Sequence, residues 1–275
     1  MDTAKIVMAS MVTENRNVRQ LIALSAPLGR NMPSIFIPTT HGTGSEVTKW
    51  GTVWDKTKKK KYSIANENLY PNVAILDGSL TLSLPISTSI VTTLDALSHS
   101  FEAIWNKNAN RISTNYAIES ICLIIKNAEK LKKNPDSLEL RNILIKASNL
   151  AGLAFSNTKT AAAHSISYPL TLYYGIPHGI ASSISLLPLL KINRTNIKAE
   201  LNKILTLLQL NDFLALENQI NKIFHDIISY RLQDWGVPQS ELNFLVKESF
   251  TKERMENNIV DLNKEDVQKI LNDIY

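Results

Sequence analysis

Residues 95–99 read DALSH and lie in an otherwise apolar part of the chain that has helical periodicity. Asp95 and His99 are four residues apart, so on a helix they share one face, with Cβ atoms about 5–6 Å apart. His164 opens another segment of helical character, and His178 lies between a proline and a glycine at a turn. Such a pair alone is common on ordinary helices. One carboxylate and three neutral imidazoles together suit Fe(II) or Zn(II), with a position left open for a substrate oxygen.

Outward from this stretch, nearly everything after Pro85 has helical periodicity. Apolar residues recur at three- and four-residue spacing through residues 117–128, 140–150, 197–208 and 220–227, and the chain closes on a helix over residues 264–274. We therefore expect an all-helical, metal-binding catalytic domain over residues 85–275.

Residues 1–84 have mixed α/β character. The apolar runs at 34–38 and 73–76 predict two buried strands, and residues 52–54 and 61–64 predict a hairpin around the lysine block 58–61. A doubly wound sheet usually needs about five or six strands. Residues 1–84 therefore look like the second half of a larger α/β domain.

The composition excludes several classes of protein. The chain has 275 residues, 44% of them hydrophobic, a net charge of +5 and a single cysteine, Cys122. One thiol makes neither an intrachain disulfide nor a cysteine-based zinc cluster. No run is long enough to span a membrane, and the N-terminus does not have the features of a secretory signal. The basic residues do not form a nucleic-acid surface. We expect a soluble, cytoplasmic protein with neither membrane nor nucleic acid as a partner.

Several motifs, in order, carry a family resemblance. Residues 39–48 (TTHGTGSEVT) form a polar loop after a strand, a type that can hold phosphates or be a plain turn. This loop resembles the TTAGTGSEVT stretch of the iron-containing (group III) alcohol dehydrogenases. Residues 72–77, 94–102, 177–179 and 258–275 are similar to further segments of that family.

The resemblance implies a fold and a chemistry. The fold is the C-terminal part of a Rossmann-like NAD(P)-binding domain plus an all-α domain, as in dehydroquinate synthase-like proteins. The implied metal, Fe(II) with Zn(II) as the alternative, is held by Asp95, His99, His164 and His178. It polarises a carbonyl while NAD(P)H delivers hydride. The implied contacts to the nicotinamide nucleotide are Asp2, Thr39, Thr40, Gly42, Thr43 and Lys61. Dimers are common in this family. The choices between NAD and NADP and between iron and zinc stay open.

Three departures from the family pattern stand out. His41 replaces an alanine of the nucleotide loop, and Tyr168 replaces a second histidine four residues after His164. A phenol there can still hydrogen-bond the alcohol, so Tyr168 is a catalytic candidate. Residues 1–5 resemble the segment just after the family's GGGS pyrophosphate loop. We therefore expect an N-terminally truncated chain that lacks roughly a hundred residues of the cofactor domain, with exposed strand edges that favour association.

The substrate prediction comes from residues 158–171, which resemble the phosphonoacetaldehyde reductase (2-hydroxyethylphosphonate dehydrogenase) subgroup. Lys159 would bind the phosphonate beside the metal, or it simply caps a helix, and Arg111 is a weaker anion candidate. Trp50, Trp54 and Trp105 are expected to be packing anchors. The alternatives are a generic short-chain alcohol dehydrogenase of the lactaldehyde or propanediol kind and a non-catalytic metal-binding remnant.

Overall fold

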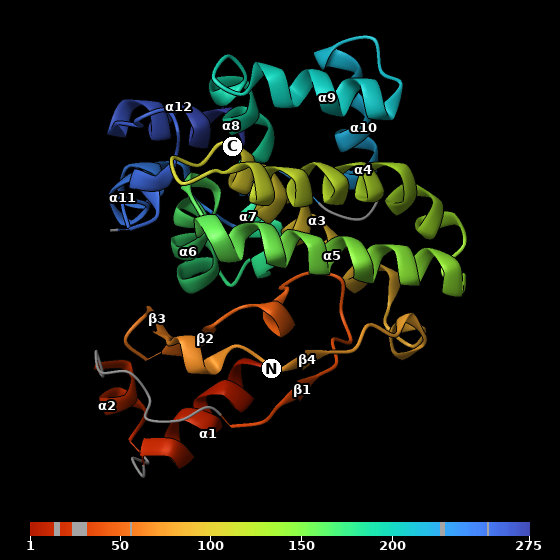
Figure 1. Cartoon of the computed structure of the whole chain (residues 1–275). Coiled ribbons are helices and arrows are strands. Elements are labelled where there is room, and N and C mark those ends of the chain that lie inside the picture. Colours follow the sequence, from red (N-terminus) through yellow and green to blue (C-terminus); the bar gives the residue numbers. More distant parts are fainter. Residues whose placement is uncertain (14–16, 24–31, 56, 226–228, 252) are drawn as a thin grey trace.

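The computed structural model describes residues 1–13, 17–55, 57–225, 229–251 and 253–275 apart from 24–31. Most of the chain is helical, and the helices form one region that lies above a smaller α/β region (Figure 1). We call residues 1–84 the α/β region and residues 85–275 the helical region. The helices of the helical region are α3 (Ile86–Ile104), α4 (Arg111–Lys133), α5 (Leu138–Thr158), α6 (Ala162–Tyr174), α7 (His178–Ser183), α8 (Leu186–Asn193), α9 (Lys198–Leu208), α10 (Phe213–Phe224), α11 (Leu242–Glu248) and α12 (Lys264–Asp273). Short 3₁₀ segments η4 (Leu232–Trp235), η5 (Gln239–Glu241) and η6 (Met255–Asn257) connect the last of them.

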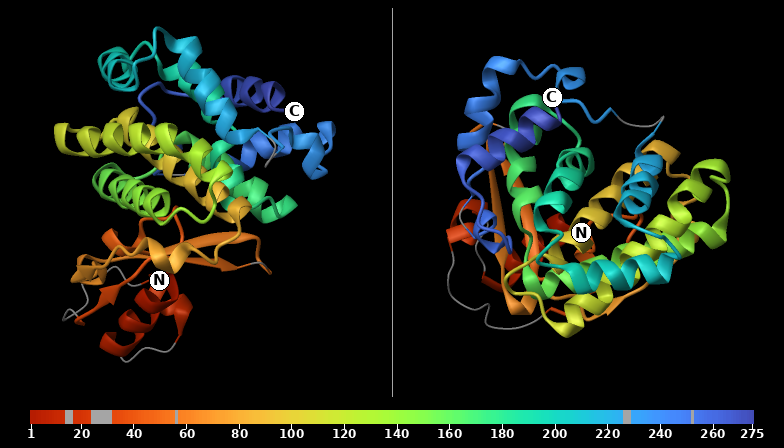
Figure 2. Two further views of the ribbon diagram at one scale, coloured as in Figure 1. Left: turned by 90° about the vertical axis from the view of Figure 1, so that its right-hand side faces the viewer. Right: turned by 90° about the horizontal axis from the view of Figure 1, so that it is seen from above.

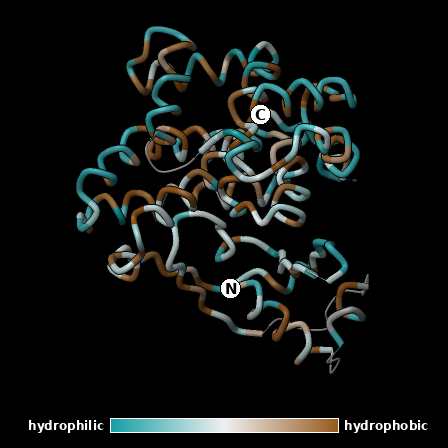
Figure 3. Tube along the Cα trace, turned by 180° about the vertical axis from the view of Figure 1, so that it is seen from behind, coloured by the Kyte–Doolittle hydropathy of each residue, from teal (hydrophilic) through white to brown (hydrophobic). Residues whose placement is uncertain are grey.

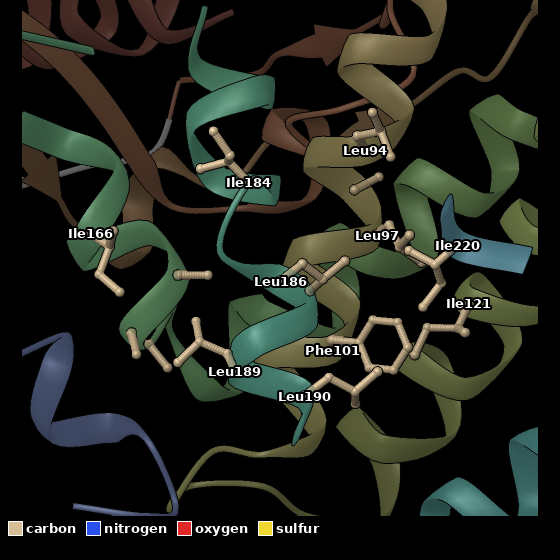
Figure 4. Packing of buried hydrophobic residues seen from close by; sticks show 14 of the residues in the cluster. Leu94, Leu97, Phe101, Ile121, Ile166, Ile184, Leu186, Leu189, Leu190 and Ile220 are labelled. Atoms are coloured by element: carbon tan, nitrogen blue, oxygen red, sulfur yellow. The ribbon is translucent and has the colours of Figure 1, made fainter. Parts of the chain in front are cut away.

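Helix α3 is the centre of the helical region. It follows Pro85, which fixes the backbone where the helix begins, and its residues 93–104 are all buried. Helices α4, α5 and α7 pack around it. Figure 4 shows Leu94, Leu97 and Phe101 of α3 within the core that these helices share. Because α3 carries the DALSH stretch, the packing of this core positions the predicted metal ligands.

The helix ends are defined by side-chain caps. Asn110 and Ser113 form a capping box at the start of α4, and Asn263 and Asp266 form another at α12. At α5 the Ser137 hydroxyl accepts a hydrogen bond from the backbone N–H of Leu140. Each cap satisfies backbone N–H groups that have no partner within the helix.

The α/β region combines helices α1 (Asp2–Thr13) and α2 (Val18–Ala23) with two separate pairs of strands. Strands β1 (Ile35–Phe36) and β4 (Val73–Ala74) are parallel, and β2 (Trp50–Asp55) and β3 (Lys60–Ala65) form the predicted hairpin. The 3₁₀ segments here are η1 (Ser45–Val47), η2 (Glu67–Leu69) and η3 (Gly78–Thr81). The left view of Figure 2 shows these elements on one side of the helical region.

The prediction that residues 34–38 and 73–76 form buried strands is wrong in one respect. The strands form, but Ile35 is 62% exposed and Val73 47% exposed, and only Phe36 on β1 is buried. Ile35 pairs directly with Val73 across the ladder, so the two apolar side chains lie on the same exposed face. An apolar run becomes buried only where further elements cover both faces of its sheet. Figure 3 shows hydrophobic segments in both regions, and the helical region buries its own far more completely.

Polar contacts of buried charges join the elements of the α/β region. The Lys5 ammonium is fully buried and donates to the carbonyl oxygens of Ser45, Thr48 and Trp50 at 2.6–3.0 Å. Burial lowers the pKa of Lys5 to about 8. The Asp2 carboxylate accepts from the Ser45 hydroxyl. These bonds fix residues 45–50 against the start of α1.

A second buried cation, Arg141 of α5, joins the two regions. Its guanidinium donates to the carbonyl oxygens of Thr81, Leu84 and Pro135. The first two of these precede α3 and the third precedes α5, so one side chain fixes the connection between the α/β and helical regions. Among the described residues, no helix is both long enough and apolar enough to cross a bilayer.

Candidate metal and substrate site

Four side chains from three helices meet next to the β2–β3 hairpin. Asp95, His99 and His164 each offer a ligand atom, and these atoms lie within 4.8 Å of one another. Nε2 of His164 is 3.4 Å from Oδ1 of Asp95, and Nε2 of His178 is 4.0 Å from the same oxygen. The structure thus brings all four predicted metal ligands together, from α3, α6 and the first residue of α7.

Glu102 contacts the backbone and the Nδ1 side of His164. One oxygen of the buried Glu102 carboxylate accepts from the backbone N–H of His164, and the other lies 2.5 Å from Nδ1. A carboxylate on Nδ1 keeps a proton there and leaves Nε2 as the free lone pair that faces Asp95. Nε2 of His164 is buried and has no hydrogen-bond partner in the part of the chain that the structure describes. This orphaned nitrogen fits a metal ligand supported by an outer carboxylate.

The electrostatics of the four side chains agree with this geometry. Burial alone would raise the pKa of Asp95, but His99, His178 and His164 outweigh it and hold that pKa well below its usual range. Burial lowers the pKa of His99 to about 4 and that of His178 to about 3. Burial also acts to lower the pKa of His164, yet the Glu102 and Asp95 carboxylates raise it to about 10. A cation at this site therefore competes with a proton on His164.

A cavity of about 560 Å³ opens over these ligands. The hairpin and the residues around α6 form its walls, and Asp95, His99, His164 and His178 are all exposed to it. Among the residues predicted to contact the nucleotide, Asp2, Thr43 and Lys61 line this cavity. An adjoining cavity of about 430 Å³ is lined by Asp2, Thr39, Thr40 and Thr43.

Gly42 lies apart from both cavities. A Cβ atom there would come within 2.9 Å of the carbonyl oxygen of Thr92, on α3. The glycine is thus needed where the loop presses against α3. His41, beside it, is fully buried, and burial together with Arg141 lowers the pKa of its imidazole to about 4.

Tyr168 lies one turn after His164 and is buried in the cavity wall. The Lys61 ammonium is 4.0 Å from the centre of its ring, and its ring stacks on His178 with 6.4 Å between centroids. Burial favours the neutral phenol, but Lys61, Arg254 and His164 lower the pKa of Tyr168 to about 8. The tyrosine thus links the predicted metal ligands to a cationic part of the cavity.

Lys159 also lines the cavity, at the C-terminal end of α5. Its ammonium lies 3.6 Å from the Glu253 carboxylate. Its backbone has φ 66° and ψ 175°, a combination that is nearly exclusive to glycine. Lys159 is therefore a strained residue whose charge is already partly neutralised. Arg111, the weaker anion candidate, is exposed and is not among the residues that line either cavity.

Two family profiles match this chain. Residues 89–275 match the C-terminal part of the Fe-containing alcohol dehydrogenases, and residues 1–78 match the iron-containing alcohol dehydrogenase profile. The chain belongs to the iron-containing alcohol dehydrogenase family.

Individual members of the iron-containing alcohol dehydrogenase family give the same result. Sulfoacetaldehyde reductase from Bifidobacterium kashiwanohense, solved with NAD⁺, has a TM-score of 0.90 at 28% identity, over 99% of this chain and 73% of that one. Long-chain-alcohol dehydrogenase 1 of Geobacillus thermodenitrificans is 31% identical over 82% of this chain. The matched segment spans 59% of the length of that dehydrogenase. 4-Hydroxybutyrate dehydrogenase of Clostridium kluyveri is 26% identical over 100% of this chain and 76% of its own length. The neighbours confirm the expected fold class, an α/β part followed by an all-α part.

Three features of this member of the iron-containing alcohol dehydrogenase family are not predicted by its sequence. Glu102 lies within the quoted family motif, but nothing in its spacing assigns it to His164. Trp54, expected to be a packing anchor, lines the cavity, with its ring 5.6 Å from that of His178. Arg254 lies near the end of the chain and reaches the cavity beside Tyr168. A partial signal for Glu102 is its spacing of three from His99, which places both side chains on one face of α3 but does not identify His164 as the partner.

Proposed function

We propose that the protein, like its family, interconverts a short aldehyde and its primary alcohol with NAD(P)H or NAD(P)⁺. The observation that carries this proposal is the convergence of Asp95, His99, His164 and His178 at the floor of one cavity. These side chains would hold Fe(II), or Zn(II), which the same ligands suit. The bound ion supplies Lewis-acid polarisation of the carbonyl oxygen.

The chain's own residues have separate tasks in this proposal. Glu102 keeps a proton on Nδ1 of His164 and so orients its other nitrogen. Tyr168 places its hydroxyl in the cavity as a hydrogen-bond donor to the substrate oxygen. Trp54 and Phe155 line the same space and exclude water from it.

The nucleotide would bind along the two adjoining cavities. Thr39, Thr40 and Thr43 line the smaller one beside the first residues of α1, and their hydroxyls suit phosphate oxygens. Lys61 belongs to β3 of the hairpin, and its ammonium lies over the rings of Trp54 and Tyr168, where the reactive end of a nucleotide would meet the substrate. Asp2 fixes the Ser45 end of the loop, and Gly42 lets that loop approach α3.

For the substrate, we propose phosphonoacetaldehyde or a similar short aldehyde with an anionic end, reduced to the corresponding alcohol such as 2-hydroxyethylphosphonate. Lys59, Lys60, Lys61, Lys159 and Arg254 all line the cavity, which supports an anion. Two relatives are named for anionic substrates, sulfoacetaldehyde and 4-hydroxybutyrate. A long-chain alcohol dehydrogenase is also a relative, which supports an uncharged substrate instead.

The test is a substrate panel on the full chain loaded anaerobically with Fe(II) or Zn(II). Consumption of NADH and NADPH is followed with phosphonoacetaldehyde, sulfoacetaldehyde, succinic semialdehyde, lactaldehyde and propionaldehyde. We expect turnover that depends on the metal, is lost in Asp95→Asn, and is greatest for an anionic aldehyde. Equal turnover of propionaldehyde would favour the generic alcohol dehydrogenase. Stoichiometric metal without turnover of any member of the panel would favour the non-catalytic alternative.

A further inference from the structure

Arg254 is a positively charged residue in the cavity wall, and no hydrogen-bond acceptor among the described residues contacts its guanidinium. It lines the large cavity, is partly buried, and holds its guanidinium 5.4 Å from the centre of the Tyr168 ring. Its side chain makes no hydrogen bond or ion pair within the described ranges. The backbone of the preceding residue, Glu253, has φ 66°, a left-handed conformation that few non-glycine residues adopt. A guanidinium that lines the cavity and has no protein acceptor is available to a ligand that enters the cavity.

Several other charged side chains around the cavity have partners, and Lys60, which has none among the described residues, is exposed at the start of β3. Lys159 lies 3.6 Å from Glu253, and the ammonium of Lys59 is 4.8 Å from the ring centre of Tyr173. The Tyr173 hydroxyl donates to Glu248 at 3.4 Å. Both acidic side chains that line this end of the cavity are thus engaged, and neither contacts Arg254.

Tyr168 connects Arg254 to the proposed metal ligands. Its ring contacts Arg254 and also stacks on His178, while Lys61 lies 4.0 Å from the ring centre. A substrate whose carbonyl lies at the metal ligands would therefore pass along Tyr168 and bring its far end to the guanidinium. Only a short carbon chain is needed to cover a single aromatic side chain.

We propose that Arg254 is the specificity-determining residue that binds the anionic end of the substrate. The planar fork of N–H donors matches two oxygens of a phosphonate, sulfonate or carboxylate, which a lysine ammonium cannot match as a pair. This assignment rests on the proposed function for the aldehyde chemistry and goes beyond it by replacing Lys159 with Arg254 as the main anion contact. Lys159 contributes less because Glu253 already offsets its charge.

The first experiment measures anion binding without turnover. Methylphosphonate, ethanesulfonate and propionate are titrated by calorimetry into the metal-loaded full chain and into four variants. In Arg254→Met, the loss of charge-assisted hydrogen bonds should lower the affinity for the preferred anion by about tenfold to a hundredfold. Arg254→Lys should fall between Arg254→Met and the unchanged chain, and Lys159→Met should lose less than Arg254→Met. Arg111→Met, an exposed arginine outside the cavity, is the control and should bind like the unchanged chain. The preferred anion identifies which of the three end groups the site takes.

The second experiment compares substrates. In Arg254→Met the ratio of kcat/KM for the preferred anionic aldehyde to that for propionaldehyde should fall by about tenfold or more. An unchanged ratio, or a larger loss in Lys159→Met, overturns the assignment. Anion binding that depends on Arg254 in a chain that reduces no aldehyde refutes the proposed function and leaves the anion site standing. Arg254→Lys keeps the test valid if Arg254→Met does not fold.

Discussion

Leu94, Leu97 and Phe101 of the helical region are fully buried, whereas Ile35 of the α/β region is 62% exposed and Val73 is 47% exposed. Ile35 and Val73 lie in short continuous apolar runs, whereas Leu94, Leu97 and Phe101 recur at helical spacing between polar residues. The helical region completes its own core from helices α3 to α12. The α/β region has a small core and relies on buried polar contacts such as those of Lys5. The proposed metal site therefore rests on the better-packed region, and the proposed nucleotide loop rests on the other.

The largest expected effect lies at the joint between the two regions. Arg141→Met keeps an apolar stem but leaves the carbonyl oxygens of Thr81, Leu84 and Pro135 without their donor. The Thr81 carbonyl keeps the Leu84 N–H as a second donor, so the loss is counted as three charge-assisted hydrogen bonds. At about 1.5–3 kcal/mol for each, the free energy of unfolding should fall by roughly 5 kcal/mol. Chemical denaturation measures this change, and hydrogen exchange should show lost protection near residues 78–90. Arg111→Met should be neutral, and equal stability of the two variants would contradict the role of Arg141 as the joint.

The next largest effect should be stabilisation by a metal ion, which should protect the helical region and not the α/β region. Fe(II) or Zn(II) at a thousandfold excess over its Kd should stabilise the chain by about 4 kcal/mol. Protection from hydrogen exchange should rise in α3, α6 and α7, which carry the ligands, and not in β1 or β4. Glu102→Gln removes the carboxylate that orients His164 and should weaken metal affinity by about tenfold to a hundredfold. Undiminished affinity in Glu102→Gln, measured by competition with a chelator, would contradict that role.

Acid should destabilise the chain partly through His41. The folded pKa of about 4 lies below the ordinary value of 6.5, so the unfolded chain takes up a proton first as the pH falls. The stabilising contribution is complete above pH 6.5 and is lost progressively down to about pH 4, with a total of roughly 3 kcal/mol. His41→Ala should therefore show a shallower fall of the unfolding free energy over this range. The two slopes are compared in metal-free protein. The pKa values of His99 and His178 are also lowered, so these residues add the same acid dependence to both slopes and the difference reports His41. Equal slopes would contradict the prediction.

The sequence predicted the local elements and the ligand spacing far better than it predicted which residues are buried. The four proposed ligand residues could be predicted because Asp95 and His99 share a helix face and the family motifs supply His164 and His178. Arg254 could not be predicted, since its approach to Tyr168 depends on how Thr251 and Asn257 contact Ser165 of α6 and Thr160 before it. The exposure of Ile35 could not be read from its neighbours either, because it depends on which elements cover the sheet. Patterns within one helix turn are local, whereas contacts between distant segments follow from the whole fold.

Relief of backbone strain should produce a smaller effect beside the cavity. Lys159→Gly removes the penalty of φ 66° and ψ 175°, whereas Lys159→Ala keeps it. Glycine is usually less stable than alanine at a given position because it loses more conformational freedom. Here Lys159→Gly should exceed Lys159→Ala by about 1 kcal/mol in unfolding free energy. Denaturation of both variants measures the difference, and the usual order, alanine above glycine, would show that the backbone is not strained.

The smallest effect on stability, and the sharpest contrast between the regions, should come from the exposed sheet face. Ile35 and Val73 lie side by side on it, and Ile37 and Ile75 are also exposed, at 43% and 44%. Ile35→Thr together with Val73→Thr keeps β-branched side chains, so the unfolding free energy should change by about 0.5 kcal/mol or less. Association between chains should nevertheless fall, because an apolar strand face with open edges favours it. Sedimentation velocity over a range of concentrations measures this. Ile112→Thr is the matched control, since Ile112 is 63% exposed but lies on α4 of the helical region. If Ile112→Thr reduced association as much as the pair on the sheet, exposure alone would be responsible, and the contrast between the two regions would fail.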